Sequence, residues 1–422
     1  MSEPDAFVHI DVAGHARAVG RLWVRAARGK ESASFEFERA WIADPVHHAF
    51  GPALPPTAGA FHSGEGRAMF GALGDSAPDR WGRRLIARNE ARRARDAGRA
   101  SRAPREVDFL LGVSDITRQG ALRFSRRDGG PFVAEGGPDA VPPLTSLGEL
   151  LAAARALEDD ADSLAADSAV QLLLAPGSSL GGARPKASVR DRDGSLAMAK
   201  FPESSDRSDV VRWELVMLTL AKRAGIEVPQ ARLELAGKTP VLLVGRFDRA
   251  GERRVPFLSA ISLLDANDGD ARSYVEIADA VRRIATRASL EGPHLWRRLA
   301  FNILASNFDD HLRNHAVIHD GAGWRLSPAY DLNPVPRSAN ERVLSTAIGL
   351  DGDTTASIEV AVAVADEFLL PPGDARKIAG EVARAIRRWR DVARRVGIGA
   401  EEIGRMETAF EHAEAEVARR WA

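Results

Sequence analysis

A polar segment directly after an apolar stretch constrains this chain most. The segment "SNFDDHLRNHAV", residues 306–317, follows the apolar residues 299–304, and residues 309–315 contain two aspartates, two histidines and an asparagine. Polar and charged groups beside a buried stretch are costly unless they are hydrogen-bonded or bind a ligand. The segment therefore binds a metal ion, transfers a proton or covers a solvated turn. Other parts of the sequence must show which of these three roles the segment has.

The overall composition is that of a globular protein. The chain has 422 residues, 45% of them hydrophobic, and a formal net charge of -1. This length suffices for two or three domains, and the balanced charge predicts neither a nucleic-acid nor a membrane partner. The absence of cysteine excludes disulfides and thiolate metal sites. No signal-like N-terminus or membrane-length apolar run is present, so we expect a cytoplasmic protein.

Two rare residue types mark where to look for a site. Only six of the 58 basic residues are lysines, and asparagine occurs only seven times, which indicates a GC-rich genome. A lysine that persists against this bias marks a place where a compact cation is needed. Lys186 and Lys200 lie around a glycine-rich turn, and four of the seven asparagines fall between residues 302 and 333.

The first third of the chain predicts a small α+β domain. Alternating residues around a glycine predict a β-hairpin over 7–24, and a further strand is expected over 33–38. Residues 76–105 predict one helix, with Ser76 or Asp79 as its cap. Residues 126–144 are rich in Gly and Pro and predict a linker or exposed loop.

The remainder predicts a β-rich half and then an α-rich half. Strands are expected over 187–190 and 196–201, followed by a helix that ends at Gly225 and by two further strands. From about residue 273 the pattern is mostly helical, with long helices over 373–395 and 399–421. We find no internal repeat.

The glycine-rich turn, "APGSSLGGARPKASV", has two readings. Its glycines let backbone N–H groups approach phosphate oxygens, but the spacing matches neither standard phosphate-binding fingerprint, so a surface turn is equally consistent. Lys200 lies in the apolar run "AMAKFP", where an inward ammonium requires an anion and an outward one only water. Glu214, on the next predicted helix, is a candidate ion-pair partner that would help position a phosphate.

The acidic segment has the spacing of a phosphoryl-transfer site. Asp309 and Asn314 are five residues apart, as are the base and a metal-binding Asn in protein kinases, and Asp331 follows an apolar run. Two alternatives remain. His311 and His315 have the spacing of helical zinc ligands, although the glutamate of HExxH is missing. The aspartates could also simply cap a helix or turn.

Taken together, these motifs resemble the HipA family of bacterial serine/threonine kinases, toxins of type II toxin–antitoxin systems. The matching segments are "SSLGGARPKASV", "AMAKFP", "WELVMLTLAKRAGIEVP", "VGRFDR", "NFDDHLRNHAV" and "LSPAYDLNP", with "GALGDSAPDRWGRRL" nearer the N-terminus. The resemblance implies an α+β fold: residues 1–125 form a HipA-like N-terminal domain, 126–144 a linker or exposed loop, 145–270 a β-rich kinase N-lobe and 271–422 a helical C-lobe.

The resemblance also implies roles for single residues. It makes Asp309 the catalytic base, and it makes Asn314 and Asp331 the ligands of Mg²⁺. Lys200 would contact the α- and β-phosphates, supported by Glu214. Further contacts to ATP would come from Leu180, Gly181, Gly182, Ala183, Lys186, Gly245, Arg246, Phe247 and His311.

The resemblance further implies regulation and partners. Ser179 in the glycine-rich loop would be autophosphorylated, and the added charge would repel ATP phosphates. The implied partners are a protein substrate, in known cases an aminoacyl-tRNA synthetase, and a helix-turn-helix antitoxin that supplies most of the contact with DNA. The ten arginines within residues 80–105 could bind the phosphates of a nucleic acid or form a solvent-exposed helix face.

Three departures from the family pattern concern the loop "ARPK", Phe308, where Thr is frequent, and the N-terminal domain, which is sparse in the usual signatures. They leave the nucleotide site intact. The alternative function is an inactive kinase-like module in a DNA-bound regulatory complex.

Overall fold

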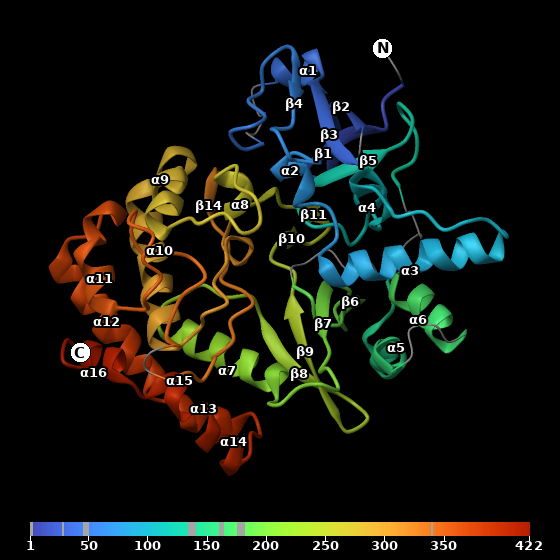
Figure 1. Ribbon diagram of the computed structural model, residues 1–422. Coiled ribbons are helices and arrows are strands. Elements are labelled where there is room, and N and C mark those ends of the chain that lie inside the picture. The colour runs from blue at the N-terminus through green and yellow to red at the C-terminus, as the bar shows by residue number, and fades with distance from the viewer. Residues whose placement is uncertain are drawn as a thin grey trace. The chain divides into compact units, whose positions relative to one another are not determined.

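The computed structural model describes residues 3–27, 29–44, 50–133, 141–159, 164–174, 182–338 and 341–422. The chain divides into two compact units, and each is described by itself (Figure 1). Unit 1 comprises Met1–Ser205, Glu234–Leu258 and Asp265–Asn267. Unit 2 comprises Asp206–Leu233, Ser259–Leu264 and Asp268–Ala422.

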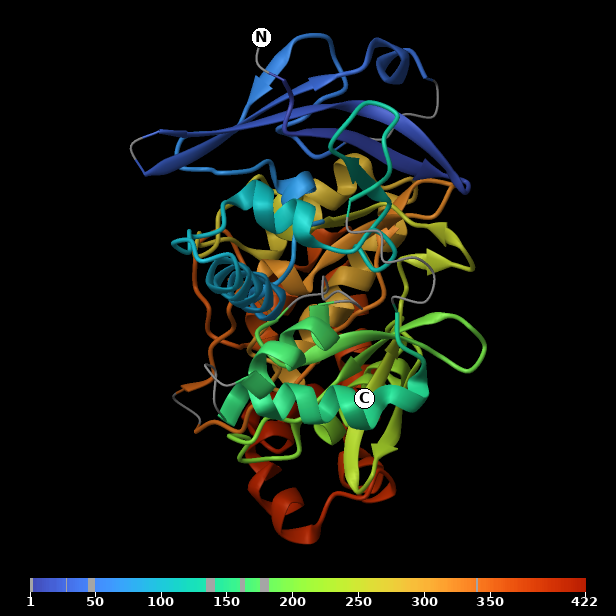
Figure 2. The same ribbon diagram turned by 90° about the vertical axis from the view of Figure 1, so that its right-hand side faces the viewer.

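Unit 1 begins with a five-stranded antiparallel sheet in the order β4-β3-β2-β1-β5, whose long twisted strands are visible in Figure 2. The hairpin predicted for residues 7–24 is confirmed, with Val12 paired to His15. Ala13 and Gly14 both have positive φ, which suits the right-handed twist of a hairpin turn. The strands are β1 (Ala6–Val12), β2 (His15–Ala27), β3 (Lys30–Phe37), β4 (Ala60–His62) and β5 (Leu122–Ser125).

The helix predicted for residues 76–105 is shorter than expected. It is α3 (Arg80–Asp96), and the Asp79 side chain caps it by accepting a hydrogen bond from the Gly82 N–H. Gly98 has a φ of 61°, and the chain resumes a helix only after Pro104. The other helices of unit 1 are α1 (Arg39–Ile42), α2 (Gly71–Gly74), α4 (Glu106–Gly112), α5 (Leu147–Asp159) and α6 (Leu164–Leu174), with the 3₁₀ turn η2 (Leu144–Ser146).

A second sheet of unit 1 has the order β6-β7-β9-β8. One of its faces shares a hydrophobic core with α5, α6 and α3, to which α3 contributes Trp81 and Leu85. Full burial of a side chain such as Leu85 contributes roughly 1.5–3 kcal/mol. The domain boundaries expected at residues 125 and 270 stay predictions. The strands are β6 (Lys186–Arg190), β7 (Leu196–Lys200), β8 (Ala231–Ala236) and β9 (Thr239–Gly245), and β10 (Arg249–Ala250), β11 (Arg253–Arg254) and β12 (Phe257–Ser259) follow.

Unit 2 is mainly helical. Its central helix, α10 (Ala288–Leu304), packs against α9 (Tyr274–Ile284) and α12 (Pro372–Ile386). Gly292 lets α10 also approach the turn that ends at Phe368, because a Cβ there would lie 2.3 Å from the Phe368 carbonyl oxygen. The other elements are α7 (Val210–Arg223), α8 (Ala260–Leu263), η3 (Leu312–Asn314), β13 (Ala316–His319), β14 (Trp324–Leu326), α11 (Ile358–Ala363), η5 (Ala365–Phe368), α13 (Trp389–Arg395), α14 (Ala400–Arg405), α15 (Glu407–Phe410) and α16 (Ala413–Arg419).

The helical prediction for the C-terminal part needs correction in three places. Between α10 and α11 the described chain has only the short η3 turn and the β13–β14 hairpin. The long helix expected over 399–421 is three short helices, because Glu411 is extended and His412 begins a new helix by capping the Ala415 N–H. The helix expected over 373–395 is likewise divided into α12 and α13.

The mixture of antiparallel sheets and helices confirms the α+β class. In the part of the chain that is described, no helix combines the length and apolarity needed to cross a bilayer.

Candidate active site

The polar residues 306–315 form an irregular loop between α10 and β13. The Asn314 side-chain amide donates a hydrogen bond of 2.7 Å to the Asp309 carbonyl oxygen, which closes the five-residue spacing into a fixed loop. The Asp309 side chain is 68% exposed. A carboxylate that is exposed while its backbone is held can reach a substrate hydroxyl.

The neighbouring Asp310 has the opposite environment. It is fully buried, and its carboxylate accepts hydrogen bonds from the Tyr274 hydroxyl and the Ser345 N–H, both at 2.7 Å. Its carbonyl oxygen accepts a further bond from the Thr346 hydroxyl. Burial raises the pKa of Asp310 to about 7, although these hydrogen bonds act in the other direction. Asp310 therefore anchors the loop that carries Asp309.

A chain of buried amides extends from this anchor. Asn302 donates to the Tyr274 hydroxyl at 2.8 Å, and its oxygen accepts from the Asn307 amide at 3.0 Å. The Asn307 oxygen in turn accepts from the Asn333 N–H at 3.0 Å. The network joins α9, α10, the Asp309 loop and the segment that follows Asp331. The clustering of asparagines in the sequence indicated this region, but not the role of Asp310 or Tyr274.

Asp331 lies in a strained backbone conformation beside a pocket of unit 2. Its φ is 56°, which is uncommon for a residue with a side chain and recurs at functional sites. The residues on either side, Tyr330 and Leu332, line the pocket together with Asp310 and Asn314.

The oxygen donors at this pocket suit Mg²⁺. Asn314 is buried, and its Oδ1 has no hydrogen-bond partner among the described residues. A buried acceptor without a donor is costly, and a bound cation would satisfy it. One amide and one carboxylate, completed by substrate phosphates and water, form the oxygen-only set that Mg²⁺ prefers. Asn314 and Asp331 therefore fit the predicted metal.

The zinc alternative does not fit the geometry of its two histidines. They flank a 3₁₀ turn rather than lying on one face of an α-helix. The buried His315 ring packs edge-on against Tyr274, with its Nε2 3.2 Å from the Asp310 carbonyl oxygen, and burial lowers its pKa to about 3. His311 is exposed, with its Nε2 3.9 Å from an Asp309 oxygen. Nowhere in the described residues do three or more His, Asp or Glu side chains gather as a metal site.

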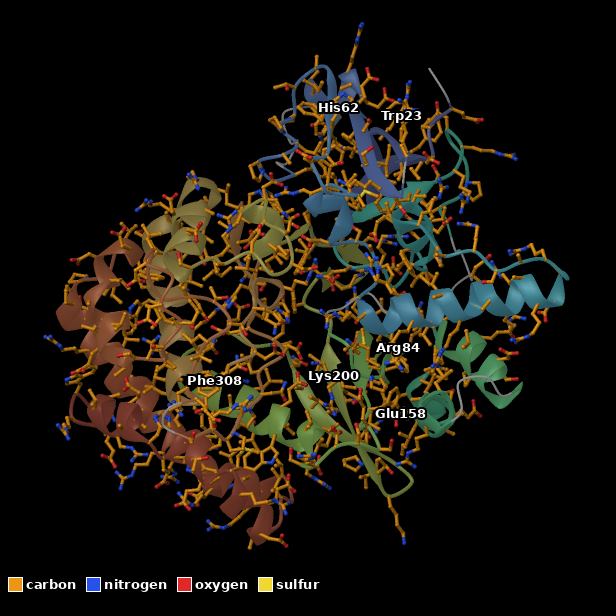
Figure 3. The ribbon with its side chains drawn as sticks, in the orientation of Figure 1. Trp23, His62, Arg84, Glu158, Lys200 and Phe308 are labelled. Carbon is orange, nitrogen blue, oxygen red and sulfur yellow. The ribbon has the colours of Figure 1, made fainter. Side chains whose placement is uncertain are left out.

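The predicted lysines lie on the second sheet of unit 1, where Figure 3 labels Lys200 at the end of β7. Lys186 on β6 and Lys200 on β7 are direct cross-strand partners, so their side chains leave the same face of the sheet. The Lys186 ammonium lies 2.6 Å from an Asp79 carboxylate oxygen, and both side chains are buried. Ser188 on this face is also buried, and its hydroxyl has no hydrogen-bond partner within the described ranges. Local sequence patterns indicated neither the ion pair between Asp79 and Lys186 nor the buried Ser188 hydroxyl.

The remaining predicted contacts to ATP are only partly described. Ser179, Leu180 and Gly181 lie outside the described residues, whereas Gly182 has a φ of 100°. The Arg246 side chain forms a buried ion pair with Asp248 at 2.7 Å. Glu214 is buried on α7 of unit 2, whereas Lys200 belongs to unit 1. The roles of these residues, and those of Gly245, Phe247 and Ala183, stay predictions.

Comparison with known proteins shows what this chain resembles. A family model described as HipA-like C-terminal domain matches residues 178–390, and one described as HipA N-terminal domain matches residues 10–102.

Two curated relatives come from Sinorhizobium fredii. The chain is 25% identical over 328 residues to "Putative kinase Y4mE", which is 71% of this chain and 71% of the relative. It is 30% identical over 179 residues to "Putative kinase Y4dM", covering 38% of this chain and 40% of the relative.

One solved structure is similar over nearly the whole chain. It is the Shewanella oneidensis MR-1 toxin–antitoxin complex of HipA, HipB and operator DNA. The match covers 99% of this chain and 96% of the other, with a TM-score of 0.64 and 17% identity, and it therefore shows the fold alone.

Proposed function

This chain belongs to the HipA family, and on that basis we propose that it is an ATP- and Mg²⁺-dependent protein serine/threonine kinase. The observation that carries the proposal is the loop around Asp309. One segment of unit 2 presents an exposed carboxylate at Asp309 and a buried amide oxygen without a donor at Asn314. Asn314 lines a pocket together with Tyr330 and Leu332, the sequence neighbours of Asp331. This is the constellation that phosphoryl transfer to a hydroxyl requires.

In the proposed reaction, the Asp309 carboxylate accepts the proton of a substrate serine or threonine hydroxyl. The hydroxyl oxygen forms a bond to the γ-phosphorus of ATP, and the bond from that phosphorus to the bridging oxygen breaks, which releases ADP. The hydrogen-bonded loop holds Asp309 before substrate binds, so little reorganisation is needed. Mg²⁺, held by Asn314 and Asp331, would neutralise phosphate charge.

The proposed partners follow the family. We infer that Ser179 is the autophosphorylated residue and that a cytoplasmic protein serine, for instance on an aminoacyl-tRNA synthetase, is the substrate. The S. oneidensis relative was solved with HipB and operator DNA, which supports a helix-turn-helix antitoxin as the partner that contacts DNA.

The arginines of α3 and the segment after it support indirect DNA contact. Six of them form ion pairs within unit 1 instead of presenting unpaired charge. The pairs are Arg83–Glu106, Arg92–Asp96, Arg95–Asp167, Arg99–Glu90, Arg102–Asp108 and Arg105–Asp108.

Incubation with γ-labelled ATP and Mg²⁺, followed by mapping of phosphorylated residues by mass spectrometry, tests the proposal. Labelled protein that depends on Mg²⁺ and is absent from Asp309→Asn is the expected result. ATP binding without transfer, combined with operator binding by the chain alone, would replace the kinase by an inactive regulatory module.

A further inference from the structure

We propose that the first turn of α3 is part of the nucleotide site, with Asp79 as a positioning residue for Lys186. The inference rests on the proposed function, since Lys186 ends the turn that would cover ATP. It assigns to the part of the chain matched by the HipA N-terminal domain a role in ATP binding that acts through Lys186. Unit 1 contains all of the contacts that carry it.

The start of α3 contacts both the side-chain ammonium and the backbone carbonyl of Lys186. Its ammonium lies 2.6 Å from Asp79 Oδ2, and the two side chains are only 3% and 5% exposed. Its carbonyl oxygen accepts a hydrogen bond of 3.0 Å from the Trp81 indole N–H. Two contacts from one helical turn fix both the backbone and the side chain of this lysine. The end of the glycine-rich turn is therefore set by α3.

The Asp79 carboxylate is itself fixed in place. Its other oxygen, Oδ1, accepts the Gly82 N–H at 2.7 Å as the helix cap. Trp81 and Leu85 bind α3 to the core beneath the β6–β7 sheet. A carboxylate held by a cap on a packed helix loses little entropy when it pairs with an ammonium.

The sheet register explains why a carboxylate is needed here. Lys186 and Lys200 are direct cross-strand partners, so two cations leave adjacent positions of one face. Like charges in this arrangement destabilise a sheet. Asp79 offsets the charge of Lys186, which lowers the repulsion on Lys200, the lysine proposed to contact ATP phosphates.

The pair also joins two matched regions of the chain. Asp79 and Trp81 lie within residues 10–102, matched by the N-terminal domain model, and Lys186 lies within residues 178–390, matched by the C-terminal model. A kinase region expressed alone would therefore lack the carboxylate that faces Lys186.

The test uses the full chain and three proteins: wild type, Asp79→Asn and Glu106→Gln. Asn at position 79 keeps a good helix-cap acceptor and removes only the charge. Glu106→Gln is the matched control, because it removes the carboxylate charge from another ion pair near the start of α3, Arg83–Glu106 at 2.6 Å, and leaves Lys186 untouched. Any general effect of weakening α3 would appear in both variants.

The first measurement is acetylation of lysine side chains, quantified by mass spectrometry without nucleotide. The exposed Lys30, Lys222, Lys238 and Lys377 serve as internal references. Release of the ammonium should raise the acetylation rate of Lys186 by about tenfold in Asp79→Asn, equivalent to about 1.4 kcal/mol. Glu106→Gln should match wild type. An unchanged Lys186 rate in Asp79→Asn would overturn the inference, whether or not the chain is a kinase.

The second measurement is the KM for ATP and the kcat of phosphoryl transfer. In Asp79→Asn we expect KM to rise about tenfold, roughly 1.4 kcal/mol, with kcat within about twofold of wild type. A purely structural role would lower the fraction of active protein, and so kcat, at constant KM; that result would overturn the inference. If wild type itself neither binds ATP nor transfers phosphate, the proposed function fails, and with it the nucleotide role of Asp79.

Discussion

Asp309 and Asp310 are adjacent in sequence but differ in every physical respect: the first side chain is 68% exposed, and the second is fully buried between a tyrosine hydroxyl and a backbone N–H. In the proposed reaction, the exposed Asp309 carboxylate receives the substrate proton, and the buried Asp310 carboxylate holds the backbone from which Asp309 projects.

Asp309→Asn should abolish transfer without affecting the fold. The exposed side chain makes no buried contact that the amide would break, so we expect a change in Tm of less than about 2 °C, as for most surface substitutions. Removal of the base should lower kcat by about 10²–10⁴. Thermal denaturation and initial rates with a protein substrate provide the check. Undiminished kcat would exclude Asp309 as the base.

Asp310→Asn should have a pH-dependent effect on stability. Burial raises the pKa of Asp310 to about 7, so the folded protein holds a proton that the unfolded chain releases near pH 3.8. The stability that this group contributes is full below pH 3.8 and is lost as pH rises through about 7.

Because Asn does not titrate, the free energy of unfolding of wild type relative to Asp310→Asn should fall between pH 5 and pH 7.5, by at most about 1.4 kcal/mol per pH unit. Urea unfolding at intervals of half a pH unit measures this difference. A difference that stays constant over this pH range would mean that Asp310 is ionised in the folded protein throughout, as it is in the unfolded chain.

His412→Asn should show the opposite dependence. Burial, followed by the nearby Arg342 guanidinium, lowers the pKa of His412 to about 4 from an ordinary value of 6.5. The stability from neutral His412 is present above pH 6.5 and is lost as pH falls towards 4. Asn can still cap the Ala415 N–H. Wild type should thus lose more stability than His412→Asn between pH 7 and pH 5, as measured by urea unfolding. If the free energies of unfolding of both proteins change in parallel with pH, the pKa of His412 is not lowered in the folded protein.

Tyr274→Phe should weaken both stability and catalysis. The hydroxyl donates to Asp310 and accepts from Asn302, so its removal leaves two buried groups without a partner, at a cost of about 1–3 kcal/mol each. We expect kcat to fall while KM for ATP is retained, because the Asp309 loop loses its anchor. Phe301→Leu, which alters the same core without breaking a hydrogen bond, is the control. Equal kcat losses in both variants would indicate general loosening of the core.

Asn314→Ala should raise the Mg²⁺ concentration needed for activity. It removes the buried Oδ1 proposed as a metal ligand and also the 2.7 Å bond to the Asp309 carbonyl oxygen. The Mg²⁺ concentration for half-maximal activity should rise at least about tenfold, which is the loss typical when a residue that supports a metal site is replaced. A titration of Mg²⁺ at saturating ATP gives this value. If kcat falls while the Mg²⁺ concentration for half-maximal activity stays unchanged, Asn314 holds the Asp309 loop and does not bind the metal.

Local pattern predicted the elements whose contacts are close in sequence. The hairpin of β1 and β2 was expected because alternation and a turn glycine suffice to specify it, and Asp79 was a candidate cap because the preference for Asp at a helix start is local. The break before the last helix was missed, since Glu411 turns extended after one helix and His412 begins the next through its side-chain cap.

The sequence by itself determined the family, the order of the motifs and the spacing of Asp309 and Asn314, because these depend on residue identity and short separations along the chain. Only the tertiary structure decided which of two neighbouring aspartates is buried and that Asp79 faces Lys186 across 107 residues. Burial and long-range pairing depend on which surfaces the folded chain brings together. No local propensity specifies the environment of a carboxylate, although that environment decides whether it supports the loop or faces a substrate.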